Sequence, residues 1–286
     1  MSTTLQGLTL HPATPAYLKE AYGLDRIEEV EGVPIFSDAQ GRQYAGGYDN
    51  LYTVVEGNAQ PVTDSIERWQ GGKRYVRYAF STVDDLFGAK RRHYLLSVPN
   101  GTGVDGRLAL YWAKTRNQVR KSLALIDDVR EGSRDRSFYD LYYRTVRRLH
   151  GVPRPLAWFE RFDAYFGKDV HTVNAYHEGA LVGANYYVRS GDYTLLLANV
   201  SHEEYWHLDI NNRLYDAYIS SAIAQGVRSI DFGPGLAADV SHAHFKQGFG
   251  GTERYMADRL YAPLTTRIKE ALSNRLTRYF RRARRA

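Results

Sequence analysis

The stretch Ser229–Gly251, SIDFGPGLAADVSHAHFKQGFGG, carries the clearest indications of how this chain folds. It opens with the apolar run Ile230–Phe232, which predicts a short buried strand that ends at a Gly-Pro-Gly turn. A short polar segment follows, and then Phe245 and Lys246 precede a cluster of glycines. The sequence thus places the carboxylate of Asp231 at the end of a strand, and a lysine beside an aromatic ring in the segment that follows.

The sequence around this stretch predicts alternating blocks of helices and strands. Upstream, Ser137 is expected to cap a helix that ends near Gly151, and LAWFERFDAYFG forms a second helix. The turn sequences Glu-Gly and Ser-Gly-Asp separate three strands. The strands are expected at 170–177, 180–188 and 193–200, a helix at 210–225, and further strands at 228–232 and 254–261. This order indicates a mixed α/β fold without the regular alternation of a doubly wound sheet.

The first half of the chain predicts shorter elements. A charged segment at 131–136 separates the two halves. The expected elements are helices at 15–23 and 108–125 and strands at 33–36, 51–55, 75–80 and 93–98.

Composition excludes several classes of protein. The 286 residues are 43% hydrophobic and 24% charged, which is typical of globular domains. The absence of cysteine excludes disulfides, thiolate catalysis and cysteine-ligated metals. The N-terminal residues do not resemble a signal peptide, and no apolar run approaches the roughly 20 residues that span a bilayer. We therefore expect a soluble cytoplasmic protein.

The positive charge is concentrated at the C-terminus. The net charge is +6, and residues 267–286 contain seven arginines, one lysine and one glutamate, which give +7. Apolar residues at helical spacing predict a basic amphipathic helix over 263–286. Such a helix binds nucleic acid, anionic lipid or an acidic protein, or it is simply a solvated helix end. The candidate RNA-binding side chains are Arg278, Arg281, Arg282, Arg284 and Arg285.

Two patterns are too weak to define a site. Asn100–Gly106 contains a literal G-x-G-x-x-G, but no βαβ repeat surrounds it and no acidic residue ends a second parallel strand. His242 and His244 point apart on a helix and lack a carboxylate at ligand spacing. The sequence therefore predicts no metal and no cofactor.

Two arginines form a possible anion-binding pair. Arg116 and Arg120 lie one turn apart in the basic segment KTRNQVRKS and form a fork for phosphate or carboxylate, or else a solvated helix face. The residues alone leave a similar choice for Asp231 and Lys246. The first either caps a turn or takes part in chemistry, and the second either is solvated or binds a ligand.

The spacing of residues in the last third resembles the Fem family of aminoacyl transferases and related acyltransferases of the GNAT superfamily. The basic segment 115–122 and the two predicted helices over 138–162 are similar to the corresponding parts of those proteins, so that the resemblance covers residues 105–262. The residues that carry it are Asn211, Leu214, Ala222, Ile223, Gly226, Ile230–Gly233 and Phe245–Gly250.

The resemblance implies two GNAT-like units in tandem. It places a degenerate unit at 1–134, a unit with the donor site at 135–262, and the basic helix at 263–286. It also implies that Phe245 and Lys246 bind the 3′ end of aminoacyl-tRNA. The lysine would stabilise an oxyanion or bind the phosphate or ribose of the donor, and Asp231 would accept the amine proton or orient a partner. The other expected site residues are Gly248, Gly250 and Asn211 toward the donor, and Arg116, Arg120 and Tyr187 toward the acceptor or a phosphate.

The chain also departs from the family pattern. Many relatives continue D-F-G with an arginine and a serine, whereas Pro234 and Gly235 stand here. The chain is short for a protein that builds peptidoglycan, and it shows no coiled-coil arm. We therefore expect the acceptor to be the amine of a small metabolite or peptide, not a cell-wall precursor.

Three functions fit these observations. The first is amide formation from aminoacyl-tRNA, the second is acyl-CoA-dependent N-acylation, and the third is RNA binding without catalysis. The segment 198–209, ANVSHEEYWHLD, is acidic and lacks the glycine-rich loop that ordinarily holds the pyrophosphate of CoA at a helix N-terminus. This favours the tRNA-dependent reaction. The sequence leaves the oligomeric state open.

Removing residues 267–286 should weaken tRNA binding and flatten its dependence on salt, because each phosphate contact releases counterions. Filter binding of total tRNA by the full and the shortened chain, across a range of salt concentrations, measures both slopes. An unchanged slope would assign the basic segment to another partner.

Overall fold

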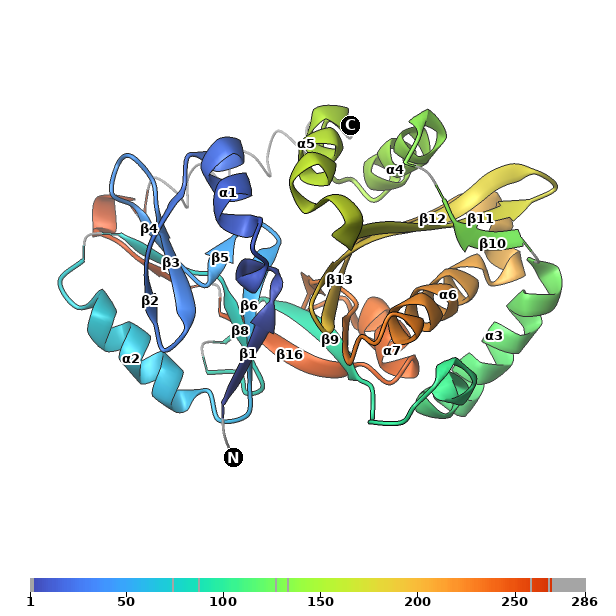
Figure 1. Ribbon diagram of the computed structural model, residues 1–286, viewed down its shortest axis with the longest axis horizontal. Helices are drawn as coiled ribbons and strands as arrows, with labels where there is room; N and C mark the ends of the chain where they lie inside the picture. Colours follow the sequence, from blue (N-terminus) through green and yellow to red (C-terminus); the bar gives the residue numbers. More distant parts are fainter. Residues whose placement is uncertain are drawn as a thin grey trace.

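A mixed sheet joins the two halves of the molecule (Figure 1). The computed structural model describes residues 3–73, 75–86, 88–126, 128–132, 134–257, 259–266 and 268. The strands of the main path follow the order β1, β6, β8, β16, β9, β14, β13, β12, β11 and β10. In that order they span Thr4–Gly7, Leu51–Glu56, Phe80–Thr82, Thr252–Ala257, Arg91–Ser97, Ser229–Asp231, Tyr193–Ser201, Ala180–Ser190, Val170–His177 and Asp128–Glu131.

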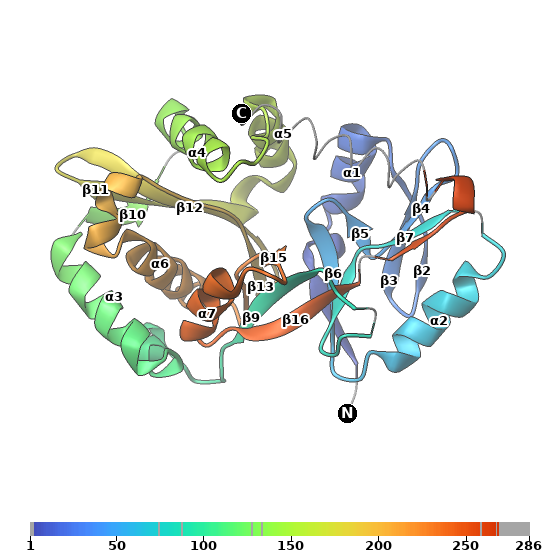
Figure 2. The same cartoon turned by 180° about the vertical axis from the view of Figure 1, so that it is seen from behind.

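Helices cover both faces of the C-terminal part of this sheet. Helices α4 (Arg136–Arg148) and α5 (Leu156–Phe166) lie on one face, and α6 (Ile210–Ala224) and α3 (Ala113–Leu125) lie on the other (Figures 1 and 2). Successive side chains of a strand point to opposite faces. Accordingly, Tyr186 of β12 packs in the core beneath α4 and α5, and the next residue, Tyr187, packs in the core beneath α6.

A smaller sheet lies in the N-terminal half. Its order is β17, β7, β4, β3 and β2, and α2 (Gln60–Gln70) packs on the core that it forms with β6. Helix α1 (Thr14–Tyr22) contacts α5 across the joint between the halves. The strands span, in order, Leu260–Tyr261, Val76–Tyr78, Gln43–Ala45, Val33–Ser37 and Asp25–Val30, and the short strands β5 and β15 span Gly47–Tyr48 and Gly235–Leu236.

The feature that creates the site is the separation of β13 from β14. These neighbours are parallel, and their pairing ends where Leu195 meets Asp231. Beyond that point β13 continues to Ser201, while the chain after β14 turns away toward α7 (Val240–Gly248). Because the two strands diverge, a gap opens beside their carboxyl ends.

The structure confirms the mixed α/β class and the order of elements predicted for the second half. The hairpin turns lie where they were expected, with Glu178 and Gly179 both at positive φ between β11 and β12. None of the described helices is long and apolar enough to cross a membrane.

Several predictions of secondary structure were wrong, including the single strands expected at 75–80 and 254–261, each of which is two strands in different sheets. The single helix at 108–125 is instead a 3₁₀ segment, Val104–Leu110, followed by α3, because Trp112 is extended and its N–H donates to Gly248 O at 2.8 Å. The cap of α4 is Asp135, whose carboxylate accepts from Phe138 N, and not Ser137. Helix α2 was not predicted, although Val62, Ile66 and Trp69 form an apolar stripe at helical spacing.

The division at 134/135 stays a prediction. Two elements before it belong physically to the C-terminal part: β10 pairs with β11, and α3 packs against α6.

A buried ion pair between a 3₁₀ segment and α6 should be important for stability. Arg107 donates twice to the fully buried carboxylate of Asp216, at 2.7 and 2.9 Å, and Tyr111 OH donates at 3.1 Å. Asp216→Ala should lower the free energy of unfolding by about 3–5 kcal/mol, because it leaves the guanidinium buried without its partner. Urea unfolding measures this difference.

Asp140→Ala is the matched control, because it removes an exposed Arg–Asp pair from the surface of α4. It should change stability by less than about 1 kcal/mol. If the two substitutions lowered the free energy of unfolding equally, the buried pair would contribute no more to stability than the exposed pair.

Candidate active site

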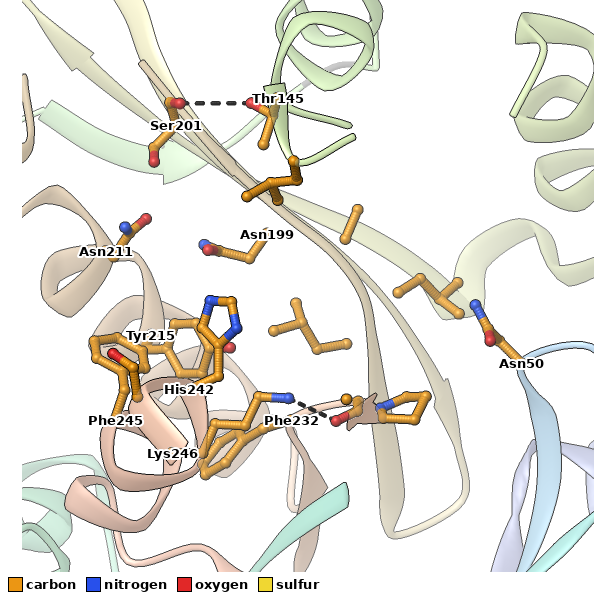
Figure 3. A pocket seen from close by; sticks show the side chains of 18 of the residues that line it. Asn50, Thr145, Asn199, Ser201, Asn211, Tyr215, Phe232, His242, Phe245 and Lys246 are labelled. Atoms are coloured by element: carbon orange, nitrogen blue, oxygen red, sulfur yellow. Dashed lines mark hydrogen bonds between the residues drawn. The ribbon is translucent and has the colours of Figure 1, made fainter. Parts of the chain in front are cut away.

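A cavity of about 470 Å³ occupies the gap between β13 and the turn after β14 (Figure 3). Its walls come from β13, residues 232–235, the start of α6, the end of α4, and α7. The N-terminal half contributes Asn50 and Arg91. A volume of this size is typical of small-molecule sites.

Lys246 points into this cavity from α7 (Figure 3). Its side chain is only 9% exposed, and its Nζ donates to the backbone oxygen of Gly233 at 2.7 Å. Burial lowers the pKa of Lys246 to about 8, against the opposing effect of the carboxylates of Asp231 and Asp239. The ammonium is therefore largely charged at neutral pH and keeps donors for a further acceptor.

Phe245 places an aromatic ring on the same wall. The ring packs edge-on against Tyr215 at 4.9 Å and lies 5.3 Å from Phe249, measured between centroids. These contacts fix the ring while it still lines the cavity. A ring held in this way suits the stacking of a base or the packing of an acyl chain.

Asp231 lies behind the cavity wall and is fully buried. Its carboxylate accepts from Tyr52 OH at 2.8 Å, Tyr193 OH at 2.7 Å and Gly233 N at 2.8 Å. His93 Nδ1 lies 2.8 Å away, although its direction is poor for a hydrogen bond, and His93 Nε2 is bonded to Ser81 Oγ. Burial raises the pKa of Asp231, but His93 and the two hydroxyls outweigh it, and the net shift is downward.

This carboxylate holds the turn that Lys246 contacts. The Asp231 side chain bonds to Gly233 N, and the oxygen of the same glycine accepts from Lys246. Gly233 has φ +73°, and a Cβ there would lie 2.6 Å from Leu196 O. Only glycine fits this turn, and the turn sets the position of the ammonium.

The β13 wall contains a bulge at the cavity. Tyr186 pairs with Ala198 and Tyr187 with Leu196, so that Leu197 is the extra residue. A bulge leaves the extra residue outside the regular ladder and turns its backbone groups away from the partner strand. Backbone N–H groups freed in this way are suitable donors to a carbonyl or an oxyanion.

The start of α6 is acidic and polar. Asp209 precedes the helix and pairs with Lys121 at 3.1 Å, and Glu203 pairs with Arg148 at 3.1 Å. Asn211 lines the cavity, and its buried Oδ1 has no hydrogen-bond partner among the described residues. Carboxylates at this helix N-terminus oppose the binding of a pyrophosphate there.

The structure brings together three residues that were predicted from sequence, Lys246, Phe245 and Asn211, with Asp231 directly behind them. Sequence reasoning missed Tyr52, Tyr193 and His93, because their contacts with Asp231 join distant parts of the chain. The alternation of apolar and polar residues places all three in strands, but it does not show which strands lie next to each other in the sheet.

Other predicted residues lie outside this cavity. Tyr187 is buried and donates to Ser221, and Arg116 donates to Tyr111 O at 3.1 Å from α3, the helix that also carries the exposed Arg120. A Cβ on Gly248 would meet Thr115, and one on Gly250 would meet Leu110 O, so that protein atoms occupy the space beside both glycines. Arg278, Arg281, Arg282, Arg284 and Arg285 lie outside the described residues.

The described part of the chain contains no group of three or more residues suited to hold a metal. His242 instead lies 2.6 Å from Asp239, the N-cap of its own helix.

Known proteins resemble this chain in part of its sequence and in its fold. Residues 113–247 match the acetyltransferase (GNAT) domain family. The solved structure of FemX superimposes over 95% of this chain and 99% of its own, with a TM-score of 0.61 and 11% identity. No curated protein sequence matches the chain.

Two further solved structures are also similar. The enzyme from Bacillus licheniformis, named L-PGS, covers 92% of both chains at 13% identity. The C-terminal domain of the putative lysylphosphatidylglycerol synthetase from Agrobacterium fabrum covers 88% of this chain and 89% of its own at 10% identity, and both TM-scores are 0.51. At such identities the likeness shows a shared fold. The chain is therefore an acyltransferase in which residues 113–247 match the GNAT domain family, within a fold similar to that of FemX.

Proposed function

We propose that this protein transfers an aminoacyl group from aminoacyl-tRNA to an amine and so forms an amide. The observation that carries the proposal is the buried, charged Lys246 beside Phe245 in the cavity between β13 and β14. The name of the putative lysylphosphatidylglycerol synthetase supports aminoacyl transfer, since a lysyl group is an aminoacyl group, although phosphatidylglycerol offers a hydroxyl and not an amine as the acceptor. The sequence resemblance to Fem-type transferases agrees with it.

The reaction requires charge stabilisation at one oxygen. The nitrogen of the acceptor attacks the ester carbonyl carbon, and a C–N bond forms as the carbonyl oxygen becomes an oxyanion. The ester C–O bond then breaks, the ribose oxygen leaves as a hydroxyl, and the amine proton balances it. Lys246 donates to the oxyanion while its bond to Gly233 O fixes its direction.

Asp231 acts as a positioning residue in this proposal. Its carboxylate is buried behind the wall and already accepts from two tyrosines and a backbone N–H. A proton acceptor must come within hydrogen-bond reach of the amine. We therefore assign Asp231 to holding the Gly233 turn and give it no proton-transfer role.

One feature favours tRNA over CoA as the donor. Asp209 is the N-cap residue of α6, at the helix N-terminus where a pyrophosphate would need cations and free N–H groups. Phe245 offers a fixed ring to the terminal base of tRNA, and such stacking contributes roughly 1–3 kcal/mol per base, but the adenine of CoA can stack on the same ring.

An acyl-CoA-dependent N-acyltransferase is the second candidate, because the matching family is described as acetyltransferases. An RNA-binding protein without turnover is the third. Destroying the tRNA with RNase, or replacing it with acetyl-CoA, distinguishes both candidates from the first.

Turnover should depend on intact RNA. Purified protein, a pool of charged tRNA and a mixture of amines should yield amide products that mass spectrometry detects. Prior RNase treatment should abolish them, because the donor ester is then lost from its carrier. Acetyl-CoA in place of the tRNA should give no product. Product formation from acetyl-CoA that resists RNase would assign the second function, and tight tRNA binding without any product would assign the third.

Lys246→Met should reduce turnover at least 100-fold while the protein stays folded, because the oxyanion loses its charged donor. The variant should also be more stable at pH 7 by about 1–2 kcal/mol. Burial of the ammonium, which lowers its pKa to about 8, opposes folding by more than its one hydrogen bond contributes. Activity assays and urea unfolding measure the two effects.

Lys19→Met is the control, because Lys19 is exposed and pairs with Asp25 far from the cavity. It should leave turnover unchanged. In the unmodified protein, kcat should fall as the pH rises through about 8, where Lys246 loses its proton. Full activity of Lys246→Met, or a rate that is level across this pH range, would remove the lysine from the mechanism.

A further inference from the structure

A second cavity, of about 460 Å³, lies in the N-terminal half next to the first. It is formed by β4, β5, β7, the end of β16 and the loop before α5 (Figure 2 shows these strands together). Arg91 lines both cavities, and its neighbour Asn50 lines the first. The two spaces therefore meet at this arginine.

The wall of the second cavity is rich in arginine. Arg77, Arg91 and Arg154 line it, and Asp49 is the one acidic residue among its described lining. Arg154 pairs with Asp49 at 2.5 Å and lies over the Trp158 ring at 4.3 Å. Asp49 also accepts a hydrogen bond from Tyr22 OH at 3.0 Å, so that groups of the protein already compensate its charge.

Arg91 differs from Arg154 in its partner. Its guanidinium donates to the neutral side-chain oxygen of Asn50 at 3.3 Å. Within the described residues Arg91 forms no ion pair, although it is half-buried at the junction. A half-buried guanidinium with only an amide partner is a strong site for a carboxylate or phosphate, which it binds with two parallel hydrogen bonds.

Tyrosines form another part of the lining. Tyr44 and Tyr48 pack edge-to-face at 5.0 Å, and Tyr22 lies 4.9 Å from Tyr48. Their mutual contacts fix the rings, which then offer apolar faces to a ligand. The cavity thus combines an apolar, aromatic wall with an anion-binding guanidinium at its inner end.

We infer that the second cavity holds the amine acceptor, and that this acceptor carries an anionic group bound by Arg91. The inference rests on the proposed transfer reaction for the identity of the ligand as acceptor. Because Arg91 lies where the cavities meet, the anionic group and the reacting nitrogen are close together in the ligand, as in an α-amino acid or an aminoalkyl phosphate. The remainder of the ligand lies against the tyrosines.

Calorimetry with matched probes tests the site without any donor. L-Phenylalanine is compared with phenethylamine, which lacks only the carboxylate, and phosphoethanolamine is compared with ethanolamine. At least one probe that carries the anionic group should bind about tenfold more tightly than its counterpart without that group, and the better pair tells carboxylate from phosphate. Arg91→Met should abolish this difference.

Arg92→Met is the matched control. Arg92 is the next residue of β9, pairs with Glu253 at 2.9 Å, and lines neither cavity. It should keep the preference for the anionic probe. Thermal melting of both variants verifies that they are folded.

Three results would overturn the inference. The first is equal binding of the two members of each probe pair, the second is an unchanged preference of Arg91→Met for the member with the anionic group, and the third is no binding of any probe at about 10 mM. The calorimetry contains no donor, so it tests the binding site separately from the reaction. If the protein binds these probes through Arg91 but shows no RNA-dependent turnover, the inferred site stands and the proposed reaction is wrong.

Discussion

The buried carboxylate of Asp231 is the interaction on which the rest of the site depends. Four strands meet at it: β14 supplies the acid, β6 and β13 supply tyrosine hydroxyls, and β9 supplies a histidine ring. An unpaired carboxylate at this depth would strongly oppose folding, so these donors are required for the charge to exist there. The same network joins the N-terminal half, through Tyr52, to the strand end that shapes the cavity.

The position of the ammonium follows from this network. Asp231 fixes Gly233, Gly233 accepts from Lys246, and helix α7 then lies across the gap between β13 and β14. The position of α7 buries the lysine, and burial lowers the pKa of its ammonium group. Stability and chemistry therefore oppose each other at this residue, which is common where a site is organised in advance of its substrate.

Local patterns in the sequence were sufficient for much of the fold. The two hairpins, helix α6 and the segment that carries Phe245 and Lys246 were all predicted, because turn residues and apolar spacing are local signals. The cavity was not, because it depends on strands from both halves. Tyr52 and Asp231 are 179 residues apart, and nothing in either neighbourhood identifies the other. For the same reason the start of α3 was misplaced, since a backbone bond to Gly248 ends the preceding turn.

The insertion of β16 between β8 and β9 has a consequence for biosynthesis. Residues 80–97 leave the ribosome long before the strand that pairs with both of their segments, Thr252–Ala257, has been made. Until then β8 and β9 expose unpaired edges, and such edges favour aggregation. The nascent N-terminal half therefore has to be kept from premature pairing, and the long sequence separation of these contacts makes their formation slow.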